Sequence, residues 1–301
     1  METVVFNSLS DWHLEVQVPP PLHPLISLIH FNDMRNRENR ESRRISYNFY
    51  KVSFMEKSPT IKMKYGQRYY DFNEGGLTFI SPNQILINES SPEELSGMAL
   101  YFHADLIARH PLGKKIKQYG FFSYSVAEAL HLSSKEKGII ISIFKQIEEE
   151  LRSSIDTLSD DILVSYIELL LNYSDRFYIR QFLTRKVANN DLVAKVESFL
   201  TTWFDGGQAQ VNGLPTVQLL SKELHMSPDY LSDMLRAYTG QSTQQHIHNK
   251  LIEKARELLS NTLLSTAEVA YALGFEHPQS FNKLFKRKTQ LSPMEFRQTF
   301  S

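Results

Sequence analysis

Two stretches near the C-terminus of the sequence carry the same pattern of apolar and polar positions, fifty residues apart. Apolar side chains recur at positions 231, 234 and 235 of the first stretch and at positions 281, 284 and 285 of the second. The i, i+3, i+4 spacing places each set on one face of a helix. Pro228 and Pro278 stand in the expected first turns, where a missing amide hydrogen costs little. The pattern therefore predicts two short amphipathic helices.

A further apolar stretch precedes each of these helices, TVQLLSKEL in the first case and TAEVAYAL in the second. When the two copies are aligned with an offset of fifty residues, Leu224 falls on Gly274, so a small residue marks the second turn. A helix, a tight turn and a polar second helix are typical of a DNA-binding helix-turn-helix, whose second helix enters the major groove. The alternative is a pair of ordinary core helices in an α bundle.

The polar face of the second copy favours the DNA-binding interpretation. Gln and Asn pair bidentately with adenine, and Lys pairs with guanine or phosphate, so Gln279, Asn282 and Lys283 are candidates for reading bases. Anionic phosphates attract cationic side chains. The candidates for the DNA backbone are Arg236 in the first copy and Lys286, Arg287 and Lys288 in the second.

The stretch between the two copies predicts one long helix. Its apolar positions share a face, namely Ile247, Leu251, Ala255, Leu258 and Leu259. Such a connecting helix would hold the two polar helices at a fixed distance.

The pattern in the first part of the chain is different. From about residue 45 to residue 86, and again over residues 97–103, short runs rich in aromatic and β-branched residues alternate with breaks such as Gly75 and Gly76. This texture predicts several short strands in a sandwich or small barrel. After residue 133, two long amphipathic stretches predict helices that form either an internal hairpin or a dimer seam.

Length and charge agree with a division into domains. A chain of 301 residues with 42% hydrophobic content is long for one domain and rich enough for folded cores. The formal net charge of the whole chain is −1. An excess of Lys and Arg over Asp and Glu is confined to the second copy and the residues that follow it. There are no cysteines, which excludes disulfides and Cys-ligated zinc. The longest apolar runs are too short to span a bilayer, and we expect a cytoplasmic protein, associated with the nucleoid when bound to DNA, with no membrane partner.

The region from about residue 190 to residue 299 resembles the DNA-binding domain of AraC/XylS-type transcriptional regulators. The residues that carry the resemblance are Gly274-Phe275, Ser280-Phe281, LFK at 284–286 and SPMEFR at 292–297. The resemblance implies two helix-turn-helix units that read adjacent major-groove segments. Carried over by position, Asp229, Ser232 and Asp233 become the base-reading candidates of the first unit.

The first part of the chain is similar to the cupin-like sensor domain of many family members. The expected fold is therefore α+β and multidomain, with an N-terminal cupin-like β barrel, then helices, then an all-α region of two helix-turn-helix units and a connecting helix. The expected boundaries are residues 1–130 for the sensor domain, residues 131–187 for a helical segment with a possible role in dimerisation, and residues 188–301 for the DNA-binding domain.

Three positions depart from the family pattern. Asp233 stands where members often carry Arg, Leu235 replaces Phe, and Gln290 replaces Gly. Carboxylates at positions 229 and 233 are repelled by phosphate unless they accept from a cytosine amino group. We therefore expect the second unit to supply most of the affinity for DNA.

The predicted barrel offers a candidate effector pocket but no metal site. Aromatic residues that can line a pocket are Tyr47, Phe49, Tyr65 and Tyr70, although core packing is the favoured explanation for any one of them. His103 and His110 stand alone, without the His-x-His pair typical of metal cupins. No metal and no cofactor is predicted.

Three functions remain open at this point. The first is a transcription regulator, most simply an activator, whose partners are double-stranded promoter DNA, RNA polymerase, a small-molecule effector and a second copy in a homodimer. The second is a metal-dependent cupin enzyme with a DNA-binding tail, which the lack of a histidine cluster disfavours. The third is a DNA-binding protein that has no ligand. We favour a protein that is not an enzyme.

Overall fold

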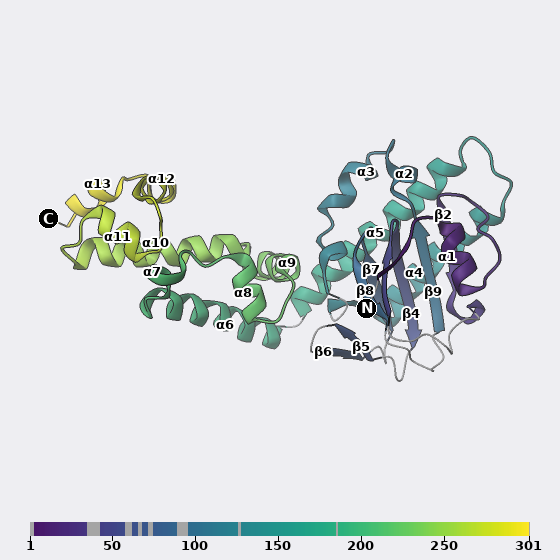
Figure 1. Cartoon of the computed structure of the whole chain (residues 1–301), viewed down its shortest axis with the longest axis horizontal. Coiled ribbons are helices and arrows are strands. Elements are labelled where there is room, and N and C mark those ends of the chain that lie inside the picture. The colour runs from purple at the N-terminus through teal and green to yellow at the C-terminus, as the bar shows by residue number, and fades with distance from the viewer. Residues whose placement is uncertain are drawn as a thin grey trace. The chain divides into compact units, whose positions relative to one another are not determined.

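The computed structural model divides the chain into two compact units, Met1–Gln181 and Phe182–Ser301. The structure describes residues 3–34, 43–57, 62–65, 68–71, 75–88, 96–125, 128–184 and 186–300. The first unit is rich in strands and the second is built of helices (Figure 1). Within these ranges, none of the helices combines the length and the apolar composition needed to cross a membrane.

The described strands of the first unit form two larger sheets and a separate hairpin. The five-stranded sheet has the order β10-β7-β4-β9-β2, and the three-stranded sheet has the order β1-β3-β8. Their bounds are β1 Thr3–Phe6, β2 Ile26–His30, β3 Arg43–Tyr47, β4 Tyr50–Lys57, β7 Gly76–Ile80, β8 Ile85–Asn88, β9 Ser96–Phe102 and β10 Leu130–His131. The hairpin pairs β5 (Lys62–Tyr65) with β6 (Arg68–Asp71). All pairs of the five-stranded sheet are antiparallel, and β2 lies at its edge.

One hydrophobic core joins the two larger sheets. It takes side chains from both, for example Tyr47 of β3 and Tyr101 of β9, and from helix α1 (Leu9–Val16), whose Trp12 is 2% exposed. The Trp12 ring meets the Tyr47 ring edge-on at 5.0 Å between centroids. The two sheets therefore share an aromatic core, but the described strands do not close a barrel, so the expected cupin-like barrel is not confirmed. The sheet-rich first unit and the helical second unit are confirmed.

Two long helices, α4 (Ser134–Arg152) and α5 (Ser159–Thr184), complete the first unit. Ser133 caps α4 in a reciprocal capping box with Glu136, as its sequence position predicts. Tyr178 of α5 packs on Phe79 of β7, so α5 is held to the sheet by aromatic contact. Short helices α2 (Ala104–Ile107) and α3 (Leu112–Lys115) and the 3-10 turns η1 (Phe31–Asp33), η2 (Ile116–Gln118) and η3 (Gly120–Ser123) fill the connections.

Over its described residues, the second unit contains the helices α6 to α13. Their bounds are α6 Lys186–Asp205, α7 Gln208–Asn212, α8 Val217–Glu223, α9 Pro228–Thr239, α10 Thr243–Asn261, α11 Thr266–Ala272, α12 Pro278–Thr289 and α13 Pro293–Gln298. The helix pairs α8–α9 and α11–α12 are the two expected helix-turn-helix units, and α10 is the expected connecting helix. The helix α10 contacts α6, α9, α11 and α13.

The turns of the two units correct one detail of the sequence alignment. The residue with positive φ is His225 (55°) in the first turn and Gly274 (88°) in the second, an offset of forty-nine rather than fifty. The hydrogen bonds agree, because the amides of His225 and Gly274 both donate to the carbonyl three residues earlier. The alignment of Leu224 with Gly274 is therefore wrong by one residue, since the second turn has one residue more before its proline.

Gly274 is required by packing as well as by its backbone angle. A Cβ atom there would stand 2.6 Å from the Ala209 carbonyl oxygen and 2.8 Å from the Gly213 carbonyl carbon. The second helix-turn-helix is thereby pressed against the end of α7.

We predict that Gln290→Gly stabilises the protein. Gln290 ends α12 in the left-handed conformation (φ 66°), where Gly240 ends α9 (φ 75°). A side chain at such a position costs about 1 kcal/mol, which glycine avoids. Urea unfolding of the full chain should show a free energy of unfolding higher by about that amount. The matched change Gly240→Ala should lower it by a similar amount, because no atom crowds that site and only the angle is strained. A loss of stability in Gln290→Gly would contradict the explanation.

Candidate nucleic-acid interface

The helix α12 presents a polar face to solvent because its apolar face is buried in the core. Phe281 and Phe285 are 0% exposed, and Leu284 is 9% exposed, all within the core that α12 shares with α10 and α11. The burial of these three side chains fixes the rotation of the helix about its axis. The side chains on the other face are therefore directed to solvent.

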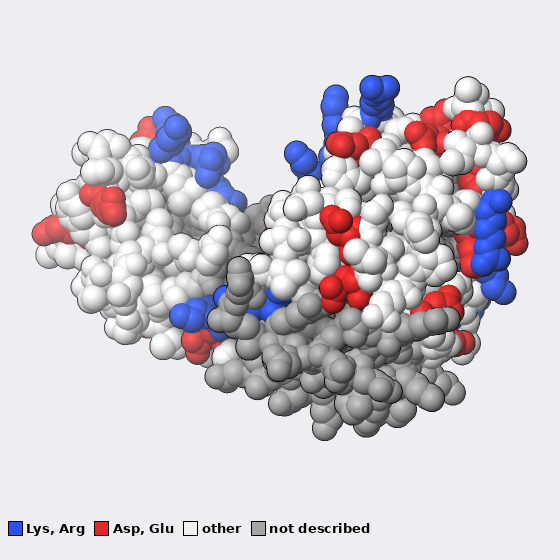
Figure 2. Space-filling view, turned by 45° about the vertical axis from the view of Figure 1, so that its right-hand side comes forward, with Lys and Arg blue, Asp and Glu red and all other residues white. Residues whose placement is uncertain are grey.

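The exposed face of α12 carries the residues that the sequence singled out in the second copy. They are Gln279, Asn282, Lys283, Lys286, Arg287 and Lys288, and all six are exposed. In the part of the chain that the structure describes, none of their side chains is tied up in a salt bridge or a side-chain hydrogen bond. Figure 2 shows Lys and Arg side chains gathered on the side of the C-terminal unit where Figure 1 places α12.

The helix α9 presents a different surface, because three of its polar side chains, Ser232, Asp233 and Arg236, are engaged in hydrogen bonds. Asp233 Oδ1 accepts a hydrogen bond of 2.7 Å from Arg236 Nη1, which forms an ion pair one turn apart on the helix. Ser232 donates to Thr243 of α10 at 3.1 Å and is thereby directed toward the connecting helix. Asp229 is exposed at the start of the helix.

The comparisons with known proteins concern this unit. Residues 220–299 match the family described as "Helix-turn-helix domain". The chain is similar to the uncharacterized HTH-type transcriptional regulator YisR of Bacillus subtilis, with 34% identity over 86 residues, which cover 29% of this chain and 30% of that protein. It is also similar to the HTH-type transcriptional activator RhaS of Enterobacter sp. (strain 638), with 31% identity over 119 residues, which cover 40% of this chain and 41% of that protein.

Among solved structures, the C-terminal domain of AraT, a response regulator from Geobacillus stearothermophilus, shares 29% sequence identity with this chain. The likeness covers 36% of this chain and 84% of that one, with a TM-score of 0.32. The C-terminal unit is an AraC-type helix-turn-helix domain. The aligned part spans about a third of the length of the curated relatives it matches.

Within this AraC-type domain, the two units differ in how their polar residues are engaged. The ion pair in α9 neutralises Asp233, so the phosphate repulsion expected of this carboxylate is reduced. The i, i+3 spacing of Asp233 and Arg236 is the sequence signal that predicts their pairing. Asp229 has no such partner among the described residues and remains a negative charge at the start of the helix.

A histidine that the sequence did not single out as a DNA contact lies beside the basic end of α12. Burial, followed by the charges of Lys288 and Arg287, lowers the pKa of His248 on α10. The Gln244 amide donates to His248 Nε2 at 2.9 Å, a bond that requires this nitrogen to be unprotonated. His248 therefore belongs to the same surface as the cations of α12 and is neutral at pH 7.

The candidate effector residues of the first unit lie outside this domain. Tyr47 and Phe49 are 3% and 0% exposed and belong to the aromatic core. Tyr65 and Tyr70 lie on β5 and β6, and their side chains fall outside the described part of the structure. Over the residues that the structure describes, no three His, Cys, Asp or Glu side chains are grouped so that they could hold a metal ion.

We predict that the Asp233–Arg236 pair acts as a unit at the DNA. Arg236→Ala removes the cation that pairs with the Asp233 carboxylate, so repulsion from phosphate should increase and binding should weaken by about 1 kcal/mol or more. Asp233→Ala/Arg236→Ala should bind better than Arg236→Ala alone, because the double variant also lacks the Asp233 carboxylate. A double-mutant cycle on DNA affinity at fixed salt measures the coupling. Additive effects of the two changes would show that the pair is irrelevant to binding.

We also predict a pH dependence that comes from His248. Because its pKa is lowered in the folded state from the ordinary value of 6.5, the unfolded chain binds a proton more readily. The stability from this group is complete above pH 6.5 and is lost as the pH falls through the lowered pKa. Urea unfolding at several pH values should show a smaller acid loss in His248→Gln than in the unchanged protein. Equal losses would contradict this assignment.

Proposed function

We propose that the chain is a sequence-specific DNA-binding transcriptional regulator whose two helix-turn-helix units read adjacent major-groove segments. The observation that carries the proposal is the face of α12 opposite its buried apolar residues, where Gln279, Asn282, Lys283, Lys286 and Arg287 are exposed, with exposed Lys288 near the end of the helix. Amides and lysines of this kind match the edges of adenine and guanine, and the cations match phosphate. The AraC-type domain supplies the framework in which α12 enters the groove.

The base-reading residues of the second unit are Gln279, Asn282 and Lys283, and the phosphate contacts are Lys286, Arg287 and Lys288. In the first unit we assign base reading to Asp229, Ser232 and Asp233 and backbone contact to Arg236, although the Ser232 hydroxyl is engaged with Thr243 and Asp233 is paired with Arg236. The second unit therefore supplies most of the affinity. The free side chains of α12, compared with the mutually bonded ones of α9, support this division.

The first part of the chain modulates this activity. We assign residues 1–130 to a cupin-like regulatory domain and residues 131–187 to a helical segment that can serve dimerisation, followed by the DNA-binding domain at residues 188–301. The two sheets that share one core support the first assignment. The name of the activator RhaS supports activation, with promoter DNA and RNA polymerase as partners. The protein needs no catalytic residues for this role.

Selection of binding sites from random DNA duplexes by the full-length protein tests the proposal. We expect an asymmetric motif with two elements about one helical turn, or roughly 34 Å, apart. The element read by α12 should be the better defined one. Failure to enrich any sequence, together with binding insensitive to salt, would overturn the proposal.

Substitutions on α12 should separate base reading from phosphate contact. Asn282→Ala and Lys283→Ala should each relax preference in one element by about 1–3 kcal/mol. Arg287→Ala should weaken binding to all sequences alike and lower the slope of log affinity against log salt by about one.

Lys195→Ala is the matched control for these variants, since Lys195 is an exposed lysine that belongs to α6 and to neither polar helix. It should change neither the sequence preference nor the slope by a comparable amount. Sequence preference that survives both Asn282→Ala and Lys283→Ala would show that other residues read the bases.

A further inference from the structure

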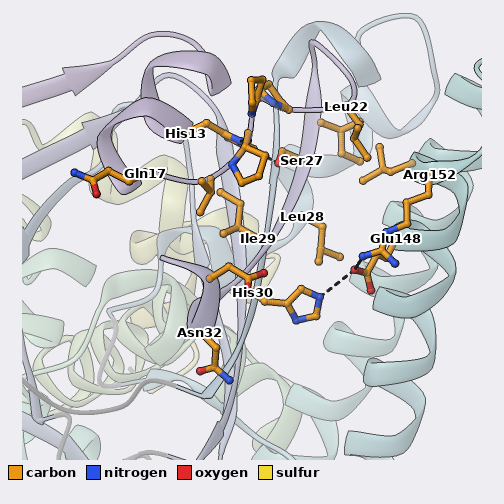
Figure 3. A pocket seen from close by; sticks show the side chains of 17 residues that line it. His13, Gln17, Leu22, Ser27, Leu28, Ile29, His30, Asn32, Glu148 and Arg152 are labelled. Carbon is orange, nitrogen blue, oxygen red and sulfur yellow. Dashed lines mark hydrogen bonds and ion pairs between the residues drawn. The ribbon is translucent and has the colours of Figure 1, made fainter. Parts of the chain in front are cut away.

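The first unit contains a cavity that the DNA-binding function does not use. It has a volume of about 690 Å³ and lies between the edge strand β2, the loop that follows α1, and the last two turns of α4 (Figure 3). Cavities of about 300–1,000 Å³ are the usual size of small-molecule sites. Its walls come from residues 13–33 and 148–152, so it is built wholly within the first unit.

One wall of the cavity carries the ion pair of Glu148 and Arg152. Glu148 Oε1 accepts from Arg152 Nη2 at 2.7 Å and also pairs with His30 Nε2 at 3.1 Å. Both contacts use the same carboxylate oxygen. For the residues that the structure describes, no hydrogen bond involves Glu148 Oε2 or the remaining N–H groups of Arg152. An acceptor and a set of donors therefore remain available side by side.

The other walls are apolar. Leu22, Leu28 and Leu151 line the space together with three consecutive prolines. Leu22 is 63% exposed, so a ligand in the cavity can cover it. In Figure 3, Leu28 and His30 of β2 are directed toward α4, where Glu148 and Arg152 stand. The cavity thus joins an apolar surface to a charged pair.

We propose that this cavity binds a zwitterion of the free amino-acid type with an apolar side chain. A single anion placed beside Arg152 also meets Glu148, and a single cation placed beside Glu148 also meets Arg152, so either is repelled. A molecule with ammonium and carboxylate on one carbon presents both charges at a spacing that matches the pair. Its carboxylate accepts from Arg152, its ammonium donates to Glu148 Oε2, and its side chain covers Leu22 and Leu151.

The charged head distinguishes free amino acids from peptides. The ammonium and the carboxylate of a dipeptide stand at opposite ends of an extended chain, at about 3.3–3.6 Å per residue, so they cannot both meet one ion pair. Modified amino acids that lack one of the two charges should also be distinguished from free amino acids. N-acetyl-leucine has no ammonium, and leucinamide has no carboxylate.

The test is ligand-observed saturation-transfer NMR with the full-length protein and L-leucine, L-phenylalanine, N-acetyl-leucine, leucinamide and Leu-Leu as probes. We expect the two free amino acids to bind and the three other compounds to bind at least about tenfold more weakly. Equal binding of N-acetyl-leucine or of leucinamide would overturn the zwitterion class. Absence of binding by every probe up to about 10 mM, a concentration that still reveals millimolar affinity, would overturn the site.

Protein variants place the binding in this cavity. Glu148→Gln and Arg152→Ala should each weaken leucine binding at least about tenfold, because each removes one charge of the pair. Their neighbours on α4 provide matched controls, since Glu149→Gln and Lys145→Ala change exposed charges outside the cavity and should leave binding unchanged. Leucine binding that is insensitive to both cavity variants would locate it elsewhere and contradict the proposal. None of these measurements requires DNA, so their outcome is independent of the proposed regulatory function.

Discussion

Burial of one face of α10 is the constraint on which the C-terminal unit depends. Ile247, Leu251, Ala255 and Leu259 are at most 2% exposed and repeat at spacings of four residues along the helix. The helix contacts α9, α11 and α13. Because a packed helix can neither rotate nor slide without opening cavities, both helix-turn-helix units are held in one register along it. The placement of α9 relative to α12 therefore depends on this single buried stripe.

Packing gives α9 and α12 similar polar faces, but the side chains on these faces differ in whether they are already engaged in hydrogen bonds. Both α9 and α12 bury an i, i+3, i+4 set, so both present a polar side. The remaining difference lies in the choice of side chains. A carboxylate at position 233 attracts Arg236 within the helix, whereas α12 has only amides and cations on this face, which have no acid to pair with. The pairing of Asp233 with Arg236 reduces the net charge that α9 presents to DNA. Among the described residues, the amide and cationic side chains of α12 have no such pairing, so their N–H groups can donate to DNA.

Periodicity and end signals were sufficient to predict most of the C-terminal unit. The apolar spacing at positions 231–235 and 281–285, with a proline before each set, predicted α9 and α12, and the stripe from Ile247 to Leu259 predicted α10. The turn register was wrong because His225 adopts a positive φ that sequence patterns assign to glycine. In the first unit the textures predicted strands and helices, but strand order depends on contacts between distant segments, which periodicity does not encode.

The cavity in the first unit illustrates the same limit, because its walls are more than a hundred residues apart in the sequence. The residues at positions 148 and 152 read as an ordinary i, i+4 pair on a helix, and nothing local indicates that His30 joins them. Only the pairing of β2 with β9 at the sheet edge and the packing of α4 beside β2 bring these side chains together.

The way in which α4 and α5 are attached to the sheet explains why a cavity can persist at this place. At one end of the pair, Tyr178 stacks on Phe121 at 5.6 Å, and Arg180 bonds Glu136, so that end is closed by core packing. At the other end the contacts are polar, with His30 bound to Glu148 at 3.1 Å and His23 bound to Asp160 at 3.1 Å. Loss of packed side chains creates costly voids, whereas polar contacts near water are exchanged at small net cost. A ligand that enters at the polar end can therefore reach the Oε2 atom of Glu148 and leave the aromatic core intact.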